Sequence, residues 1–377
     1  MIDTAIISIP RNKIITLANT QGYFPEWIPQ SKTKSYAKWI KNMPKQKEKT
    51  DPYYPRLTAY KRWSKNDSII PIINIEFSIP KLIYKNNLDE VEEKDFNRVI
   101  ETLKKRLYEM GEVIEKKELE YAVISSFHPS KNIALADGYR AYGVIKELSK
   151  INLTKKLELT KVNFKNDGKA LQMYAINHSI VFYDKIADLN QNKKKAVDKD
   201  QTIFQKSLFE EIKINLPTLE ILRLEIRLSK KQKMNAVMKH LGFEENPTFK
   251  DIFKNDVCQK IVRWYWEEII KGENLFIFEL ENNPSKLLKD ILRKNPKIRL
   301  SKAINLVGLS VLCKDCGIRG LRDISEKHIK QRNWYSVSNN IKQLNEISDG
   351  KPLHTWVKQI EDTLTDFKPY QTTFRPP

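Results

Sequence analysis

Between Leu219 and Leu228 the sequence is Leu-Glu-Ile-Leu-Arg-Leu-Glu-Ile-Arg-Leu, in which apolar and charged residues alternate from Leu222 onward. A period of two is typical of a β-strand whose two faces meet different surroundings. One face would carry the apolar residues Leu222, Leu224, Ile226 and Leu228, and the other would carry Arg223, Glu225 and Arg227. The charged face is either simply solvated or a functional surface with a carboxylate between two guanidiniums.

Three further stretches have the pattern of strands, namely Ile73–Pro80, Tyr121–His128 and His178–Lys185. In the second, Tyr121, Val123 and Phe127 are expected to face the core. If all four strands share one sheet, one of its faces gathers Glu76, His128, Tyr183, Lys185 and Glu225. Such a face could hold a divalent cation beside a tyrosine nucleophile, with basic residues for phosphate.

The chain is strongly basic, with 67 Lys and Arg against 47 Asp and Glu and a formal net charge of +20. The surplus is clustered in Lys32–Lys49, Lys230–Lys239 and Lys286–Lys302. A basic background would spread evenly over the chain, whereas clusters favour binding to a polyanion, with nucleic acid as the first candidate. We therefore expect nucleic acid as the partner.

The three cysteines, Cys258, Cys313 and Cys316, offer one Cys-x-x-Cys pair and no second pair at zinc-ligand spacing. Reduced structural cysteines are the simpler interpretation. No apolar run approaches the ~18 residues of a membrane span, and the N-terminus lacks a basic segment followed by an apolar one. We expect a cytoplasmic protein without a membrane partner.

The character of the chain changes near Asn246, where a β-rich part gives way to helical spacing. This predicts an α+β fold with an antiparallel sheet and helices packed on one of its faces, in residues 1–245. An all-α domain would follow in residues 246–377. Within it, Ala303–Gly317 and Ile324–Val337 could form a DNA-reading helix-turn-helix or an ordinary helix pair.

Two catalytic motifs are missing from the sequence. There is no Gly-x-x-x-x-Gly-Lys loop, which argues against an ATPase. There is also no His-hydrophobic-His pair, the usual metal motif of rolling-circle initiators and relaxases.

Four segments occur together in one order: the opening Met-Ile-Asp, Ile75–Lys81 followed by Asn86-Asn87, Ser179–Lys185, and Leu222–Arg227. Together they resemble the gene II replication initiators of filamentous phages and their phage and plasmid relatives. The resemblance covers most of residues 1–245. It extends weakly into the helical part, which is similar to the region that such phages also make as the separate gene X protein.

The resemblance implies an endonuclease that nicks one strand of origin DNA and stays linked to the 5′ phosphate through a tyrosine. It later rejoins the strand into a circle, and a host helicase and a single-stranded DNA-binding protein would assist. Tyr183 would be the nucleophile and Lys185 its neighbouring cation. Glu225 would hold Mg²⁺ or Mn²⁺, with His128, where the phage protein has an aspartate, and Glu76 as further ligands.

The basic residues expected to contact DNA are Arg223, Arg227, Lys81, Lys131, Lys230 and Lys231. A tyrosine ester keeps the energy of the phosphodiester, so rejoining needs no ATP, in agreement with the missing nucleotide loop. Two alternatives stay open: an initiator that binds and melts DNA without cutting it, and a regulatory single-stranded DNA-binding protein. In both, Tyr183 would be a packed core residue.

Overall fold

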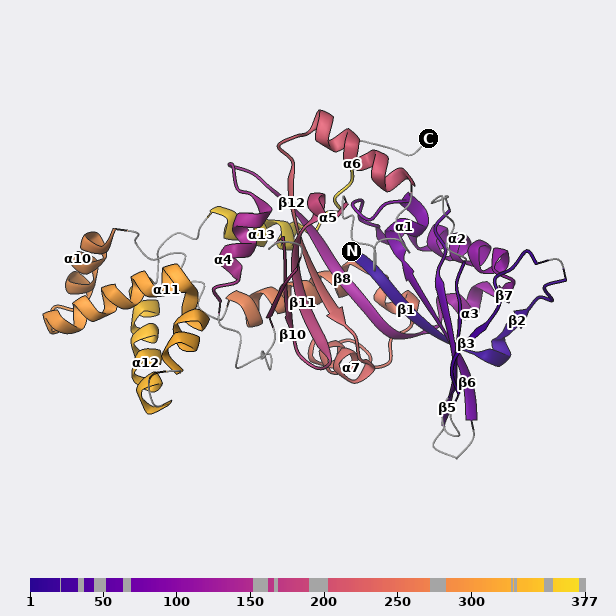
Figure 1. The fold of residues 1–377 in the computed structure, drawn as a ribbon, viewed down its shortest axis with the longest axis horizontal. Helices are drawn as coiled ribbons and strands as arrows, with labels where there is room; N and C mark the ends of the chain where they lie inside the picture. Colours follow the sequence, from indigo (N-terminus) through magenta and orange to yellow (C-terminus); the bar gives the residue numbers. More distant parts are fainter. Residues whose placement is uncertain are drawn as a thin grey trace.

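The computed structural model describes the chain in segments: residues 1–20, 22–32, 37–43, 52–63, 69–151, 162–165, 169–189, 203–271, 283–326, 328, 331–348 and 355–372. These residues form an α+β fold with a large antiparallel sheet, helices against it, and further helices near the C-terminus (Figure 1). The predicted fold class is confirmed at this level. The basic cluster Lys32–Lys49 lies largely outside the described residues.

The sheet has ten strands in the order β3-β4-β5-β6-β1-β8-β12-β11-β10-β9, and every neighbouring pair is antiparallel. The strands are β1 (Ile2–Pro10), β3 (Ile28–Lys32), β4 (Ala37–Lys41), β5 (Arg56–Trp63), β6 (Ile69–Ser78), β8 (Val123–Leu135), β9 (Val162–Lys165), β10 (Ala170–Tyr174), β11 (His178–Asp184) and β12 (Glu220–Leu228). A separate two-stranded sheet pairs β2 (Ile14–Thr16) with β7 (Glu112–Ile114).

The four predicted strands lie together in the centre of this sheet, with β1 between β6 and β8. Glu225 of β12 pairs with Ser130 of β8 on one side and with Val181 of β11 on the other. Arg223 pairs with Tyr183. Because residues opposite each other point to the same face of a sheet, His128, Tyr183, Arg223, Glu225 and Arg227 share one face. We call it the polar face.

Strand β8 differs from the prediction at its start. Tyr121 precedes the strand, and both Tyr121 and Val123 are exposed, whereas Ile124 and Phe127 are buried. The register between β1 and β8 shifts here, from Ile6 opposite Ser126 to Ile7 opposite Ile124. One extra residue in β8 forms a bulge, which reverses the alternation N-terminal to it. The prediction for Tyr121 and Val123 was therefore wrong.

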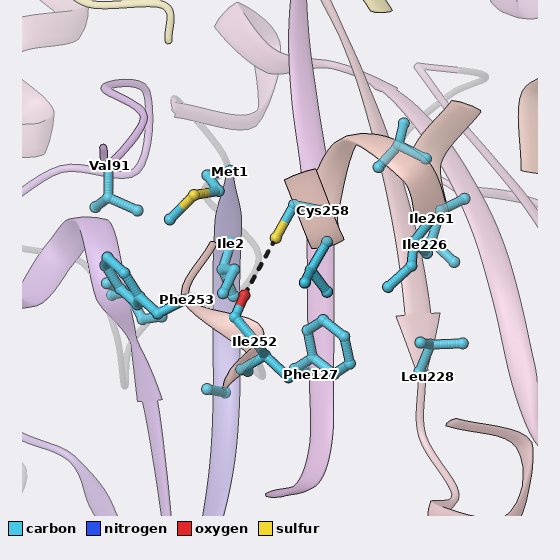
Figure 2. Packing of buried hydrophobic residues seen from close by; sticks show 14 of the residues in the cluster. Met1, Ile2, Val91, Phe127, Ile226, Leu228, Ile252, Phe253, Cys258 and Ile261 are labelled. Atoms are coloured by element: carbon cyan, nitrogen blue, oxygen red, sulfur yellow. Dashed lines mark hydrogen bonds between the residues drawn. The ribbon is translucent and has the colours of Figure 1, made fainter. Parts of the chain in front are cut away.

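The opposite face of the sheet is apolar and is covered by helices. They are α2 (Phe96–Glu109), α4 (Ala141–Leu148), α7 (Lys231–His240), α8 (Phe249–Ile252), α9 (Asn255–Trp264) and α13 (Thr355–Asp366). Figure 2 shows part of this core, where Phe127 and Ile226 of the sheet meet Ile252 and Ile261 of the helices. Cys258 is buried in it as a free thiol.

The prediction that helices cover only one face of the sheet was wrong, because two helices also pack on the polar face. Helices α5 (Lys185–Leu189) and α6 (Ile203–Asn215) bring Leu189, Leu208 and Ile212 against Ile221. Ile221 has the same parity along β12 as Arg223, so this small cluster covers one end of the polar face. The polar face is therefore enclosed at that end and more open elsewhere.

A second apolar cluster belongs to α10 (Pro284–Lys294), α11 (Leu300–Glu326) and α12 (Gln331–Ser348), which stand at one end of the molecule (Figure 1). Helix α11 changes direction at Gly317, whose φ of 74° suits a residue without a side chain. Because α8, α9 and α13 pack on the sheet, the separate helical unit begins near residue 283, later than the boundary expected near Asn246. Among the described residues, no helix is both long and apolar enough for a membrane span.

The apolar face contains one buried histidine, His178, which is 8% exposed. Its ring lies 5.7 Å from the ring of Tyr265, and neither of its nitrogens has a hydrogen-bond partner in the described part of the chain. Burial lowers the pKa of His178 to about 4, and the charge of Lys233 acts in the same direction. The ring is therefore neutral in the folded protein at pH 7.

This histidine should make the fold sensitive to acid. Since the folded protein binds the proton less readily than the unfolded chain, the stability is fully present above pH 6.5 and is lost as pH falls toward 4. A difference of this size corresponds to roughly 3 kcal/mol. We expect His178→Phe to flatten the fall in unfolding free energy between about pH 7 and about pH 4.5, measured by urea denaturation. Identical pH slopes in both proteins would exclude His178 as the titrating group.

Candidate functional site

The polar face brings a tyrosine, a carboxylate, a histidine and two arginines into contact. The Tyr183 hydroxyl lies 3.1 Å from Glu225 Oε2. The other oxygen of Glu225, Oε1, lies 2.7 Å from Arg227 Nε and 3.2 Å from His128 Nδ1. These four residues come from β8, β11 and β12, and the sequence predicted that they would meet. We call them, together with Arg223 and Asp3, the tyrosine cluster.

Arg223 connects the cluster to the surrounding strands. Its Nε donates to Asn132 Oδ1 at 2.6 Å and its Nη2 to the carbonyl oxygen of Asn87 at 2.6 Å. Its Nη1 lies 2.9 Å from Asp3 Oδ1 and 3.5 Å from the Tyr183 hydroxyl. Arg223 is only 1% exposed. It therefore acts inside the protein and presents no surface to DNA in this arrangement.

Asp3 was not predicted to belong to the cluster, although the opening Met-Ile-Asp is part of the family resemblance. The register between β1 and β8 shifts between Ile2 and Thr4, so Asp3 lies at an irregularity where alternation does not give its direction. Asn132 was also missed. It continues the alternation His128, Ser130, Asn132 along β8, and that signal was present in the sequence.

Burial of Tyr183 holds its proton in place by raising its pKa. Burial raises the pKa of Tyr183 well above 10, Glu225 adds to the rise, and Arg223 opposes it. Burial alone would raise the pKa of Glu225 as well, but the charge of Arg227 and the hydrogen bond from His128 outweigh it and hold that pKa well below 4.5. At neutral pH the pair is thus a phenol donating to a carboxylate.

Lys185 is not on the strand face where alternation placed it. Strand β11 ends at Asp184, and Lys185 begins α5, fully buried. Its ammonium lies 5.4 Å from the centre of the Tyr183 ring and 3.1 Å from Asp188 Oδ2. Burial lowers its pKa to about 8, with Arg223 acting in the same direction and Asp188 opposing. Lys185 therefore adds positive charge beside the tyrosine ring rather than beside its hydroxyl.

Glu76 and Lys81 lie apart from these contacts. Glu76 of β6 is separated from β8 by β1, and its carboxylate is 3.7 Å from Arg56 Nη1. Lys81 belongs to α1 (Ile79–Tyr84) and is 9% exposed. Both line a cavity together with Asp3, which links that cavity to the tyrosine cluster.

Lys131 faces the apolar side of the sheet. It pairs with Leu224, which alternation places in the core, and it is 1% exposed. Its ammonium forms a buried ion pair with Glu90 and donates to the Lys368 carbonyl at 2.6 Å. Glu90 also accepts from the backbone N–H of Asn132 and of Tyr370. The prediction that Lys131 contacts DNA was therefore wrong, because its side chain is buried and serves the structure of the core.

The remaining expected DNA contacts are more accessible. The side chain of Arg227 is 33% exposed, and Lys230 and Lys231 are exposed where β12 leads into α7. In the Lys286–Lys302 cluster, α10 carries Lys286, Lys289 and Arg293 in exposed positions. These residues leave two basic surfaces available to phosphate.

Two of the predicted metal ligands, the carboxylate of Glu225 and the imidazole of His128, lie together in the cluster, whereas the carboxylate of Asp3 pairs with Arg223. No group of three His, Cys, Asp or Glu suited to a metal occurs in the part of the chain that the structure describes. Mg²⁺ often takes only one or two carboxylates and fills its remaining positions with water and substrate phosphate. The pair fits such an ion in number, but an ion would compete with Arg227 for Glu225.

In comparisons with known proteins, no family model, curated protein or solved structure matches the chain.

Lys131 and Lys231 allow a direct comparison of a buried and an exposed lysine. Lys131→Met removes one partner of a buried ion pair and should lower the unfolding free energy by about 3 kcal/mol. Lys231→Met should change it by less than about 0.5 kcal/mol. DNA affinity of the folded proteins should fall for Lys231→Met only. Urea unfolding and fluorescence anisotropy with a labelled oligonucleotide measure both quantities.

The opposite pattern would restore Lys131 as a DNA contact. In that case Lys131→Met would keep its unfolding free energy and lose more DNA affinity than Lys231→Met.

Proposed function

We propose that the protein is a DNA strand transferase that nicks one strand by attack of Tyr183 on a phosphodiester and initiates rolling-circle replication. The observation that carries the proposal is the Tyr183 hydroxyl, held between the Glu225 carboxylate at 3.1 Å and the Arg223 guanidinium at 3.5 Å. The resemblance to the gene II initiators and the net charge of +20 support it. The DNA is then both partner and substrate.

The tyrosine must lose its proton as it attacks, and Glu225 Oε2 is in position to accept it. The tyrosine oxygen bonds to phosphorus, the bond from phosphorus to the 3′ oxygen breaks, and the 3′ oxygen leaves as a hydroxyl after taking up a proton. The product is a 5′-phosphotyrosine and a free 3′ end. Reversal of the same steps rejoins the strand without ATP.

Arg227 gives the substrate a way to activate Glu225. Its guanidinium is a main cause of the low pKa of Glu225, and it is half-buried with one side toward solvent. An incoming phosphate would attract the guanidinium, because arginine binds phosphate through charged, paired hydrogen bonds. A weaker hold on Glu225 raises the basicity of that carboxylate when the substrate is in place.

Positive charge beside the tyrosine would stabilise the reaction further. Arg223 lies 3.5 Å from the Tyr183 hydroxyl and would favour the negative charge that develops on its oxygen, while Lys185 adds positive charge beside the ring. Mg²⁺ or Mn²⁺ held by Glu225 and His128 would polarise the scissile phosphate. A host helicase and a single-stranded DNA-binding protein are the further partners that strand displacement calls for.

The nucleophile can be tested by Tyr183→Phe. We expect loss of nicking and of the covalent adduct, with affinity for single-stranded origin DNA within a few-fold of wild type, because only the hydroxyl is removed. The measurement is transfer of labelled oligonucleotide to protein that survives boiling in detergent. Tyr174→Phe, a tyrosine opposite Ser179 on the neighbouring strand, is the matched control and should keep full activity. An adduct with the Phe variant would assign the nucleophile elsewhere.

The role of Glu225 can be tested by Glu225→Gln, which keeps the shape of the side chain but removes a proton acceptor and an anionic ligand. We expect nicking to fall by about 100-fold or more, while DNA binding persists. Initial rates measured across a range of Mn²⁺ concentrations also report any change in the metal midpoint. Glu220→Gln on the same strand changes the charge equally and should leave the rate unchanged. Wild-type rates in Glu225→Gln would remove this carboxylate from the chemistry.

A further inference from the structure

A cavity of about 170 Å³ lies beside the tyrosine cluster. Its wall includes the polar residues Asp3, Arg56, Glu76, Ser78, Lys81 and Asn87. They come from β1, β5, β6, α1 and the segment after α1. Its volume is well below the roughly 300–1,000 Å³ of pockets for drug-sized ligands. It suits a single ring system rather than a larger molecule.

The charges of the wall favour an uncharged ligand over a phosphate. Two carboxylates, Asp3 and Glu76, face two cations, Arg56 and Lys81. A phosphate would be repelled by the carboxylates, whereas a nucleobase can use both kinds of partner. Arg56 and Glu76 are cross-strand neighbours with 3.7 Å between Nη1 and Oε1. They offer a pair of donors directly beside a pair of acceptors.

Two residues that line the cavity also contact Arg223 of the tyrosine cluster. Asp3 lines the cavity and also contacts Arg223 Nη1 at 2.9 Å, and Arg223 lies 3.5 Å from the Tyr183 hydroxyl. Asn87 lines it too, and its carbonyl accepts from Arg223 at 2.6 Å. A DNA strand with its phosphate at Tyr183 would therefore bring a neighbouring nucleotide to the cavity.

We propose that this cavity binds one unstacked guanine of the DNA strand, next to the phosphate that Tyr183 attacks. The assignment of the strand rests on the proposed function. Among the four bases, guanine alone places two acceptors, O6 and N7, beside two donor groups, N1–H and N2–H₂. An arginine fork matches the acceptors, as it does in DNA major grooves, and the Glu76 carboxylate matches the donors.

The test compares single-stranded oligonucleotides of about 12 nucleotides, all thymidine except for one central guanine, adenine or cytosine. Fluorescence anisotropy with the full chain and a metal chelator measures binding without cleavage. We expect the guanine oligonucleotide to bind about tenfold more tightly than the all-thymidine one. Glu76→Gln should abolish this preference, since the amide replaces an acceptor by a donor.

Glu101→Gln is the matched control, because it removes the same charge from an exposed carboxylate on α2 that pairs with Lys116. It should keep the guanine preference. No preference in the wild type, a preference for another base, or a preference that survives Glu76→Gln would each overturn the proposal. Circular dichroism and thermal unfolding verify that each variant is folded. Covalent transfer to Tyr183 is measured separately, so loss of the proposed nicking activity and loss of the guanine site are distinguishable.

Discussion

The buried guanidinium of Arg223 is the interaction on which the polar face depends. At 1% exposure its charge is removed from water, which is strongly unfavourable unless hydrogen bonds replace the lost solvent. It has partners from three directions: Asn132 on β8, Asp3 on β1 and the backbone of Asn87. A lysine could not replace it, because a single ammonium lacks the planar fork that reaches these partners together. The register of β12 against its neighbours is thereby fixed, and with it the position of Tyr183.

On the core side of the sheet, the buried ion pair between Glu90 and Lys131 is connected to the contacts of Arg223. Glu90 accepts from the N–H of Asn132, whose side chain accepts from Arg223, so Asn132 joins the two networks. Burial would raise the pKa of Glu90, but the Met1 amine and Lys131 lower it to about 2. Residues after α13 complete this network through Tyr370 and Thr372, which hydrogen-bond to Glu90 and Asp89. The site is therefore held by both ends of the described chain.

Local alternation was enough to predict much of the site. The residues Tyr183, Glu225 and Arg227 lie on regular strands, and neighbouring antiparallel strands bring residues of like parity together. Glu76 also lies on a regular strand, yet β1 separates it from β8 and from the cluster. The sequence did not indicate this separation, because strand order cannot be deduced from the period alone. Asp3 was missed because a register shift interrupts the alternation there. Lys185 was misplaced because its strand ends one residue earlier, at Asp184.

The same burial that fixes the cluster also sets its reactivity. A fully exposed tyrosine and carboxylate would each be solvated and close to their ordinary pKa values. Here burial and Glu225 raise the pKa of Tyr183, while Arg227 and His128 lower that of Glu225. At neutral pH the proton therefore stays on the tyrosine, and in the proposed mechanism an incoming phosphate draws Arg227 away from the carboxylate so that Glu225 can accept it. Because Arg227 is the more exposed of the two arginines, the proposed mechanism assigns the incoming phosphate to it, while Arg223 keeps the strands in register.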